Sequence, residues 1–295
     1  MKPQQKQSQW ILHLVFIVVS VLCLLPFLLL FTSSITDENE IIQSGYSLFP
    51  DKISFAAYGY LFRDASAIVR AYSISILVTV IGTLVSLCII SLLAYPLSRK
   101  DLPFRKFLAF FVFFTMLFNG GLVPTYYVYT QIFDLKNSFL ALIIPYLLLN
   151  GFYVLLARTF FMTSIPVPII ESAYIDGAGE FKIFYKIVLP LSLPILATIG
   201  LFQIINYWND WFNSLIFITD SKLFGLQYML NKILLDIQFL STSDMGGNQA
   251  EALASLPKEG VRMAMAVIGV IPILITYPFF QKFFVKGLTV GAVKG

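Results

Sequence analysis

Several apolar runs in this chain are long enough to cross a lipid bilayer, and this feature limits the possible folds more than any other. A helix needs about 20 consecutive apolar residues to span the hydrocarbon core. Runs of about that length cover residues 10–31, 71–97, 107–129, 138–161, 191–218 and 262–285. Apolar residues make up 58% of the chain and charged residues 12%, whereas about a quarter of the residues in soluble domains are charged. The sequence therefore predicts an all-α, polytopic membrane protein with six transmembrane helices.

The basic residues predict which ends of these helices face the cytoplasm. Six spans place the N-terminal segment 1–9 and the C-terminal tail 286–295 on the same side of the membrane. Lys and Arg are enriched in cytoplasmic loops. The short loop 98–106 contains Arg99, Lys100, Arg105 and Lys106. We therefore expect both termini, this loop and the loop 162–190 in the cytoplasm of a bacterial cell, with the spans in its plasma membrane.

The remaining segments carry fewer signals. No cleavable signal peptide is expected, because the apolar run after the basic N-terminus is too long for one. The polar loops 35–69 and 220–261 fall on the outer side. The middle of the second loop, 241–250, is polar and contains Gly, so we expect it to be mobile.

The sequence lacks the residue patterns that an enzyme of this size would need. It contains no G-x-x-x-x-G-K-[ST] phosphate loop and no G-x-S-x-G nucleophile motif. His13 is the only histidine, and Cys23 and Cys88 lie inside predicted spans, which argues against a metal site or a disulfide. The net charge of +4 comes from scattered residues, so it does not indicate nucleic-acid binding. We expect a chain that is not an enzyme and binds no cofactor or metal.

A charged stretch, residues 171–194, interrupts the apolar pattern between the fourth and fifth spans. Gly177 and Gly179 lie in its middle, so the spacing predicts two short helices with a bend between them. The apolar residues that recur here at steps of three and four are Ile175, Ala178, Phe181, Phe184, Tyr185 and Val188. That spacing is typical of one helix face, and a short amphipathic helix of this kind suits the groove of a partner protein.

This stretch resembles the EAA signature of the membrane subunits of ABC importers, in which Glu-Ala-Ala is followed at fixed spacing by Gly and then by Ile-x-Leu-Pro. The matching residues here are Glu171, Ser172, Ala173, Asp176, Gly177, Ala178, Ile187, Leu189 and Pro190. Ser172 replaces the first Ala of the pattern, a change between small residues. The resemblance implies that residues 162–190, named here the coupling loop, bind a separate ATPase subunit that uses ATP and Mg²⁺.

The resemblance also implies roles for these positions. Glu171 and Asp176 would make polar contacts with the ATPase. The small residues Ala173, Gly177 and Ala178 would allow close packing. The pair Leu189-Pro190 would set the angle at which the chain enters the fifth span.

Across nearly its whole length the chain resembles the carbohydrate-importer permeases of the maltose-type group. The segment 119–126, Asn-Gly-Gly-Leu-Val-Pro-Thr-Tyr, is most similar to members linked to oligosaccharide and polysaccharide uptake, and the tail 287–295 is similar to the C-terminus of such permeases. The resemblance implies a type I importer permease fold. It also implies a second homologous permease, an ATPase dimer and an extracytoplasmic solute-binding protein as partners, with a sugar as substrate.

Polar and aromatic residues inside predicted spans are the candidates for the substrate pathway. The candidates are Asn206, Tyr207, Trp208, Asn209, Asp210, Trp211 and Asn213 in the fifth span, Asn119 in the third and Asn150 in the fourth. Asn206, Asn209, Asp210 and Asn213 recur at steps of three and four, so we expect them in one stripe. Polar residues are costly in hydrocarbon, so this stripe should face the bundle interior. Amide groups can bind sugar hydroxyls, and aromatic rings can stack on the C–H faces of a sugar. The alternative is that these amides only form hydrogen bonds between helices.

Three other functions remain open from the sequence. The Asn119-Gly120-Gly121 break in the third span and the intramembrane Asp210 would also fit an ion-coupled secondary transporter. A membrane scaffold without a pathway, and an ABC importer for amino acids or peptides, are further possibilities.

Overall fold

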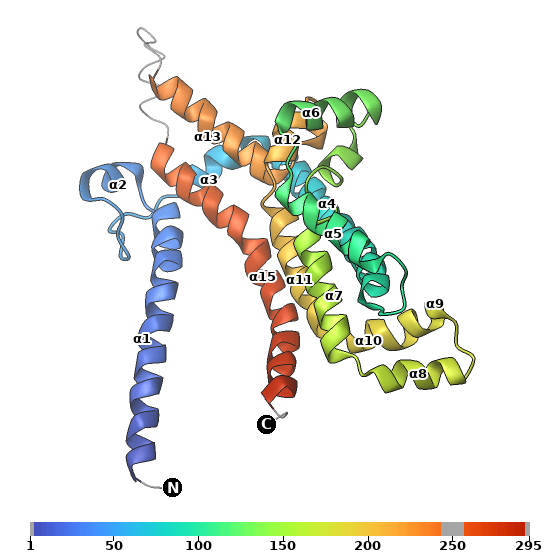
Figure 1. Cartoon of the computed structure of the whole chain (residues 1–295). Helices are drawn as coiled ribbons and strands as arrows, with labels where there is room; N and C mark the ends of the chain where they lie inside the picture. Colours follow the sequence, from blue (N-terminus) through green and yellow to red (C-terminus); the bar gives the residue numbers. More distant parts are fainter. Residues whose placement is uncertain (1–2, 243–256, 293–295) are drawn as a thin grey trace. The chain divides into compact units, whose positions relative to one another are not determined.

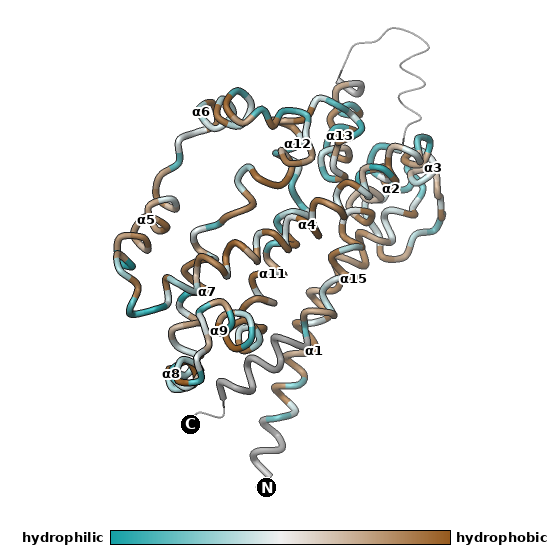
Figure 2. Tube along the Cα trace, turned by 90° about the vertical axis from the view of Figure 1, so that its right-hand side faces the viewer, coloured by the Kyte–Doolittle hydropathy of each residue, from teal (hydrophilic) through white to brown (hydrophobic). Residues whose placement is uncertain are grey.

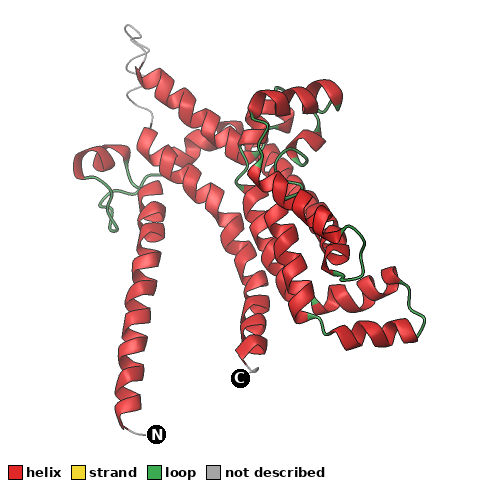
Figure 3. Ribbon diagram, in the orientation of Figure 1, coloured by secondary structure: helices red, strands yellow, loops and turns green. Residues whose placement is uncertain are grey.

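The computed structural model describes residues 3–242 and 257–292, and these residues form helices joined by loops (Figures 1 and 3). The chain divides into two compact units. The first comprises Met1–Ile68 and Leu230–Ile271, and the second comprises Val69–Met229 and Pro272–Gly295. The predicted all-α fold is confirmed.

The first unit contains a long apolar helix and a polar loop. Its helices are α1 (Pro3–Ser34), α2 (Glu38–Ser44), α3 (Ala56–Leu61) and the 3₁₀ turn Phe62–Asp64, with parts of α13 (Leu226–Thr242) and α15 (Lys258–Ala292). Most apolar side chains of α1 are exposed, as expected for a helix that faces lipid. The loop is fixed by Glu38, whose carboxylate accepts hydrogen bonds from the backbone amides of Glu259 and Gly260 at 2.9 and 3.0 Å. This contact caps the first turn of α15.

The second unit is a bundle of helices around an apolar core. Its elements are α4 (Ala65–Ser98, with its first turn in the other unit), α5 (Arg105–Leu117), α6 (Leu122–Tyr127), the π-helical turn Val128–Ile132, the 3₁₀ turn Phe139–Leu142, α7 (Gly151–Ser164), α8 (Val167–Ile175), α9 (Glu180–Ile183), the π-helical turn Phe184–Val188, α10 (Leu189–Leu191), α11 (Leu193–Trp208), α12 (Phe212–Phe217) and the 3₁₀ turn Ser221–Leu223. Ile90, Val154 and Ile199 are fully buried where α4, α7 and α11 pack together. Figure 2 shows these three helices as largely hydrophobic.

The coupling loop forms a helical hairpin that turns sharply away from the helices on either side of it (Figure 1). α7 ends at Ser164, where Ile165-Pro166 follows, and the chain bends by 78° into α8. The segment Glu180–Leu191 bends by 77° into α11. Both turns occur beside proline, which removes a backbone donor and cannot continue a straight helix. The predicted pair of short helices is confirmed.

Two helices differ from their expected ranges. Residues 138–161 are α-helical only from Gly151, because Pro145 interrupts the preceding segment and the Asn150 side chain caps α7 by accepting a hydrogen bond from the amide of Phe152. Residues 191–218 break at Asn209–Trp211. There the Asp210 side chain accepts hydrogen bonds from the first amides of α12 and starts a new helix.

The number of spans depends on how the bent helices are counted. Among the described residues, three helical segments are long and apolar enough to cross a membrane alone, namely Gln9–Ser34, Ala56–Ser98 and Lys258–Gln281. The total rises to up to 6 if each bent pair counts as one span. One such pair, Arg105–Leu117 with Leu122–Ile132, is bent by 113°. The break expected in the third span at Asn119-Gly120-Gly121 is therefore present.

The two remaining segments fall partly outside the described residues. The expected tail, 286–295, continues α15 as helix to Ala292, and 293–295 lie outside the described residues. The stretch expected to be mobile, 241–250, is described only to Thr242, at the end of α13.

Candidate functional site

The bend of the hairpin depends on the backbone conformation of Gly177. The Gly177 amide donates to the carbonyl of Tyr174, and the Ala178 amide donates to the carbonyl of Ala173, both at 2.9 Å. This pair of hydrogen bonds is a Schellman motif, which ends a helix with one residue in the left-handed region. Gly177 supplies that residue, with φ of +72°, and a Cβ added to it would meet open space. The glycine is therefore required by the turn and not by crowding within the chain.

The six apolar residues that the spacing placed on one helix face are divided between two environments. Phe184 and Val188 are buried in the core, whereas Ile175, Phe181 and Tyr185 are 86%, 82% and 71% exposed. The prediction of a single face was wrong. The turn at Gly177 separates Ile175 from the later residues. Within 180–188, the exposed pair Phe181 and Tyr185 lies on a different side from the buried pair Phe184 and Val188. The hairpin thus buries one apolar set in the core that it shares with the bundle and leaves another set exposed.

The signature residues of the coupling loop are also divided. Glu171, Ser172, Asp176, Gly177 and Pro190 are exposed. Ala173 is 8% exposed and belongs to the core that α8 shares with α4 and α7. Ala178, Ile187 and Leu189 are partly buried and pack against the same core. Within the described structure, the exposed residues are available to a partner, and the others hold the hairpin against the bundle.

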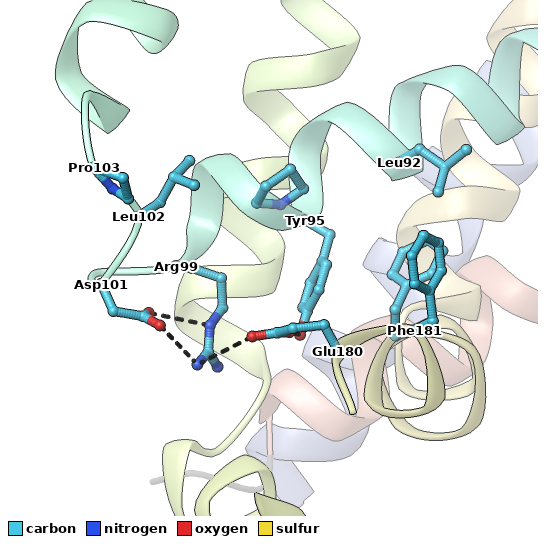
Figure 4. Close-up of a pocket in the computed structure, with 10 residues that line it drawn as sticks. Leu92, Tyr95, Arg99, Asp101, Leu102, Pro103, Glu180 and Phe181 are labelled. Atoms are coloured by element: carbon cyan, nitrogen blue, oxygen red, sulfur yellow. Dashed lines mark hydrogen bonds and ion pairs between the residues drawn. The ribbon is translucent and has the colours of Figure 1, made fainter. Parts of the chain in front are cut away.

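A polar cluster that the sequence did not indicate lies between the hairpin and the end of α4. The Glu180 carboxylate accepts hydrogen bonds from the hydroxyl groups of Tyr95 in α4 and Tyr174 in α8. Arg99 approaches the same carboxylate at 4.0 Å (Figure 4) and donates to the Tyr174 hydroxyl at 3.0 Å. The Arg99 guanidinium also lies over the Tyr174 ring, 5.3 Å from its centroid. We name Tyr95, Arg99, Tyr174 and Glu180 the Glu180 cluster.

The protonation state of Tyr174 fits its role as a donor in this cluster. Partial burial, together with its hydrogen bond to Glu180, raises the pKa of Tyr174 to about 12. The hydroxyl therefore keeps its proton near neutral pH and donates to the carboxylate. The sequence did not indicate a role for Glu180, because its partner Tyr95 lies 85 residues away in the chain.

Most of the fifth-span candidates are occupied by contacts within the chain. Asn206 donates to the Tyr153 hydroxyl at 3.1 Å, and Asn213 donates to the carbonyl of Pro145 at 3.0 Å. The Tyr207 hydroxyl donates to the carbonyl of Ile143 at 3.0 Å. Such bonds between segments are the structural alternative that the sequence left open.

Gln203, which the sequence analysis did not select, takes part in the same bonding. It is 1% exposed and bonds both Ser86 in α4 and the carbonyl of Leu147. Gln203 is a polar residue inside the predicted fifth span, one turn before Asn206, so the criterion that selected the other candidates could have indicated it.

Of the remaining candidates, three accept hydrogen bonds from backbone amides at turns or helix starts, one is a buried aromatic residue, and two are exposed. Asn119 caps the turn at Gly121, and Asn150 and Asp210 cap helices as described above. Trp208 is 4% exposed, and its ring lies 5.9 Å from that of Tyr72. Asn209 and Trp211 are exposed at the break between α11 and α12. The expected continuous stripe of amides is absent, because α11 ends at Trp208.

Comparison with known proteins connects this architecture to transport. The family described as binding-protein-dependent transport system inner membrane component matches residues 5–290. The polygalacturonan/rhamnogalacturonan transport system permease protein YtcP of Bacillus subtilis (strain 168) is 40% identical, with 94% of each chain covered. The arabinooligosaccharides transport system permease protein AraQ of Halalkalibacterium halodurans is 27% identical, covering 97% of this chain and 96% of that protein.

A solved structure has the same fold. It is the crystal structure of a bacterial ABC transporter involved in the import of the acidic polysaccharide alginate, and one of its chains matches with a TM-score of 0.77 and 28% identity. The match covers 96% of this chain and 99% of that one. The resemblance drawn from the coupling loop is thus confirmed over almost the entire length. The chain belongs to the family of binding-protein-dependent transport system inner membrane components.

Proposed function

We propose that this chain forms half of the translocation pathway of an ATP-driven importer for an oligosaccharide or polysaccharide fragment. The polygalacturonan and alginate transporters among its relatives support a carbohydrate substrate. The ion-coupled alternative loses its main support, because the Asp210 carboxylate accepts hydrogen bonds from two amides of α12 at 3.2 and 3.3 Å. A carboxylate used in this way is explained by helix capping.

The coupling loop is the proposed contact with the ATPase, and its exposed apolar side chains carry this proposal. Ile175, Phe181 and Tyr185 are large, apolar and exposed on a hairpin that turns by 78° and 77° from its flanking helices. Exposed aromatic and aliphatic anchors of this kind commonly dominate a protein interface. The hairpin and both termini lie on the cytoplasmic side, where the ATPase uses ATP and Mg²⁺, and the chain itself performs no catalysis.

Purification of the intact complex tests this function directly. The chain is extracted from its native membrane in a mild detergent, and the proteins that accompany it are identified by mass spectrometry. We expect a second, homologous permease and an ATPase, with a solute-binding protein joining when the matching sugar is present. Recovery of the chain alone, under conditions that keep an unrelated ABC importer intact, would contradict the proposal and favour an ion-coupled transporter.

Asn209 and Trp211 are the proposed contacts with the sugar, because both are exposed at the break between α11 and α12. An aromatic face and an amide each contribute about 1 kcal/mol to such a contact. We expect the double variant Asn209→Ala, Trp211→Ala to reduce uptake at low sugar concentration by about tenfold or more, with normal recovery of the complex. The measurement is uptake of radiolabelled oligosaccharide by whole cells.

A matched variant separates sugar contact from the general loss of an exposed tryptophan. Trp10 is 74% exposed on α1, so Trp10→Ala should leave uptake close to the wild-type rate. Unchanged uptake in the Asn209, Trp211 double variant would assign the sugar contacts to the second permease.

A further inference from the structure

The last turns of α4 contact the coupling loop although no short connection joins them in sequence. The loop is continuous with α7 at one end and with α11 at the other. Tyr95 in α4 reaches Glu180 in α9, 85 residues further along the chain. Arg99, directly after α4, reaches Tyr174 in α8, 75 residues away. The Glu180 cluster is therefore a non-covalent link from both helices of the hairpin to a third helix.

Two further arginines hold the same end of α4 in place. Arg158 in α7 donates to the carbonyl of Leu97 at 2.9 Å. Arg105, at the start of α5, donates to the carbonyl of Arg99 at 3.2 Å. Carbonyl groups at a helix C-terminus lack intrahelical partners, and basic side chains stabilise them. The end of α4 is thus fixed to α5, α7 and the hairpin by polar contacts with defined directions.

Apolar packing between α4 and α9 is incomplete beside this cluster. A cleft of about 360 Å³ opens there, lined by Leu92, Pro96, Phe181 and Phe184 among others (Figure 4). The Tyr95 and Phe184 rings pack together, with centroids 5.2 Å apart, but side chains are separated across the rest of the cleft, so packing constrains the position of α9 against α4 less at this edge. The hydrogen bonds of Glu180 fix that position, and such bonds depend strongly on direction.

We propose that Glu180 locks the coupling loop to the C-terminal end of α4, so that α4 moves together with α7 and α11 when the ATPase displaces the loop. Glu180 is then a positioning residue, which acts through Tyr95 and Arg99 and touches neither ATP nor sugar. The inference rests on the proposed ATPase contact of the coupling loop. The inference makes α4 a third helix, beside α7 and α11, that moves with the coupling loop and so helps to open the pathway when the ATPase moves.

The experiment uses the whole complex, reconstituted in proteoliposomes with both permeases, the ATPase and the binding protein. Sugar uptake and ATP hydrolysis are measured in parallel, and their ratio gives the coupling. We expect Glu180→Ala to lower the sugar transported per ATP by about fivefold or more, with normal copurification of the ATPase. Glu180→Gln, which can still bond both tyrosine hydroxyls, should restore much of the ratio.

Two further variants show whether the link itself is responsible. The double variant Tyr95→Phe, Tyr174→Phe removes both hydroxyl donors with almost no change in volume, and it should reproduce the loss seen in Glu180→Ala. If the complex that carries Glu180→Ala does not assemble, the tyrosine double variant serves as the test in its place. Asp101→Asn is the matched control, because Asp101 pairs with Arg99 at 3.2 Å within its own loop and is not one of the bonds to the hairpin. Its ratio should remain within about twofold of wild type.

A wild-type ratio in both Glu180→Ala and the tyrosine pair would overturn the proposal. Loss of assembly in both variants would also overturn it, since the cluster would then only stabilise the fold. A separate result would show that the coupling loop does not bind the ATPase. In that case, variants of Gly177 and Phe181 would transport normally. If those variants lose transport and the Glu180 variants do not, the coupling loop binds the ATPase without α4 being locked to it.

Discussion

Replacing Gly177 with valine is expected to abolish transport while the chain still inserts into the membrane. The residue has φ of +72° in the turn that ends α8. A side chain in the left-handed region costs about 1–2 kcal/mol, and a β-branched one is an outlier there. The chain would relieve this strain by changing the angle between α8 and α9, which moves the exposed residues that we propose bind the ATPase. Uptake and ATPase copurification, measured on membranes with equal amounts of the chain, check the result.

The neighbouring glycine provides a matched control. Gly179 has φ of −74° and ψ of +162°, which any residue adopts, and open space surrounds it. Gly179→Ala should therefore keep nearly full transport. Gly177→Asn should retain more activity than valine, because asparagine tolerates the left-handed conformation. Full activity of Gly177→Val would show that the hairpin angle has no role in coupling.

The double variant Ile175→Asp, Phe181→Asp is expected to release the ATPase from the membrane complex. Both side chains are more than four-fifths exposed, at 86% and 82%, so the change leaves the core of the chain unaltered. In a docked complex these residues would be buried anchors, and losing one anchor typically costs about 2 kcal/mol or more. That corresponds to about 30-fold weaker binding for each residue. The measurement is the amount of ATPase that copurifies with the tagged chain.

The control for this variant is an equally exposed aromatic residue on another loop. Phe49 is 86% exposed and lies between α2 and α3. Phe49→Asp should leave ATPase recovery unchanged, which shows that an exposed Asp does not itself disrupt the complex. Normal ATPase recovery with the Ile175, Phe181 double variant would place the docking surface elsewhere on the coupling loop.

The sequence predicted those features that depend on residues close together in the chain. The lengths of the apolar runs identified a helical membrane protein, because each run must satisfy its own backbone hydrogen bonds in lipid. Gly177 indicated the bend in the hairpin, and Asn119-Gly120-Gly121 indicated the break after α5. Each of these residues constrains the backbone conformation next to it, and that constraint is the same whatever the rest of the chain packs against.

The tertiary structure decided which side chains meet and which are exposed. Spacing placed six apolar residues on one face, but Phe184 and Val188 are buried whereas Phe181 and Tyr185, in the same helical segment, are exposed. Spacing also placed the amides near Asn206 in one stripe, but α11 ends at Trp208 and Asp210 starts a separate helix, α12. Glu180 bonds Tyr174 six positions away in α8, but its other partner, Tyr95 in α4, lies 85 positions away. Periodicity describes one helix about its own axis, whereas contacts depend on how separate helices pack, and only the folded chain contains that information.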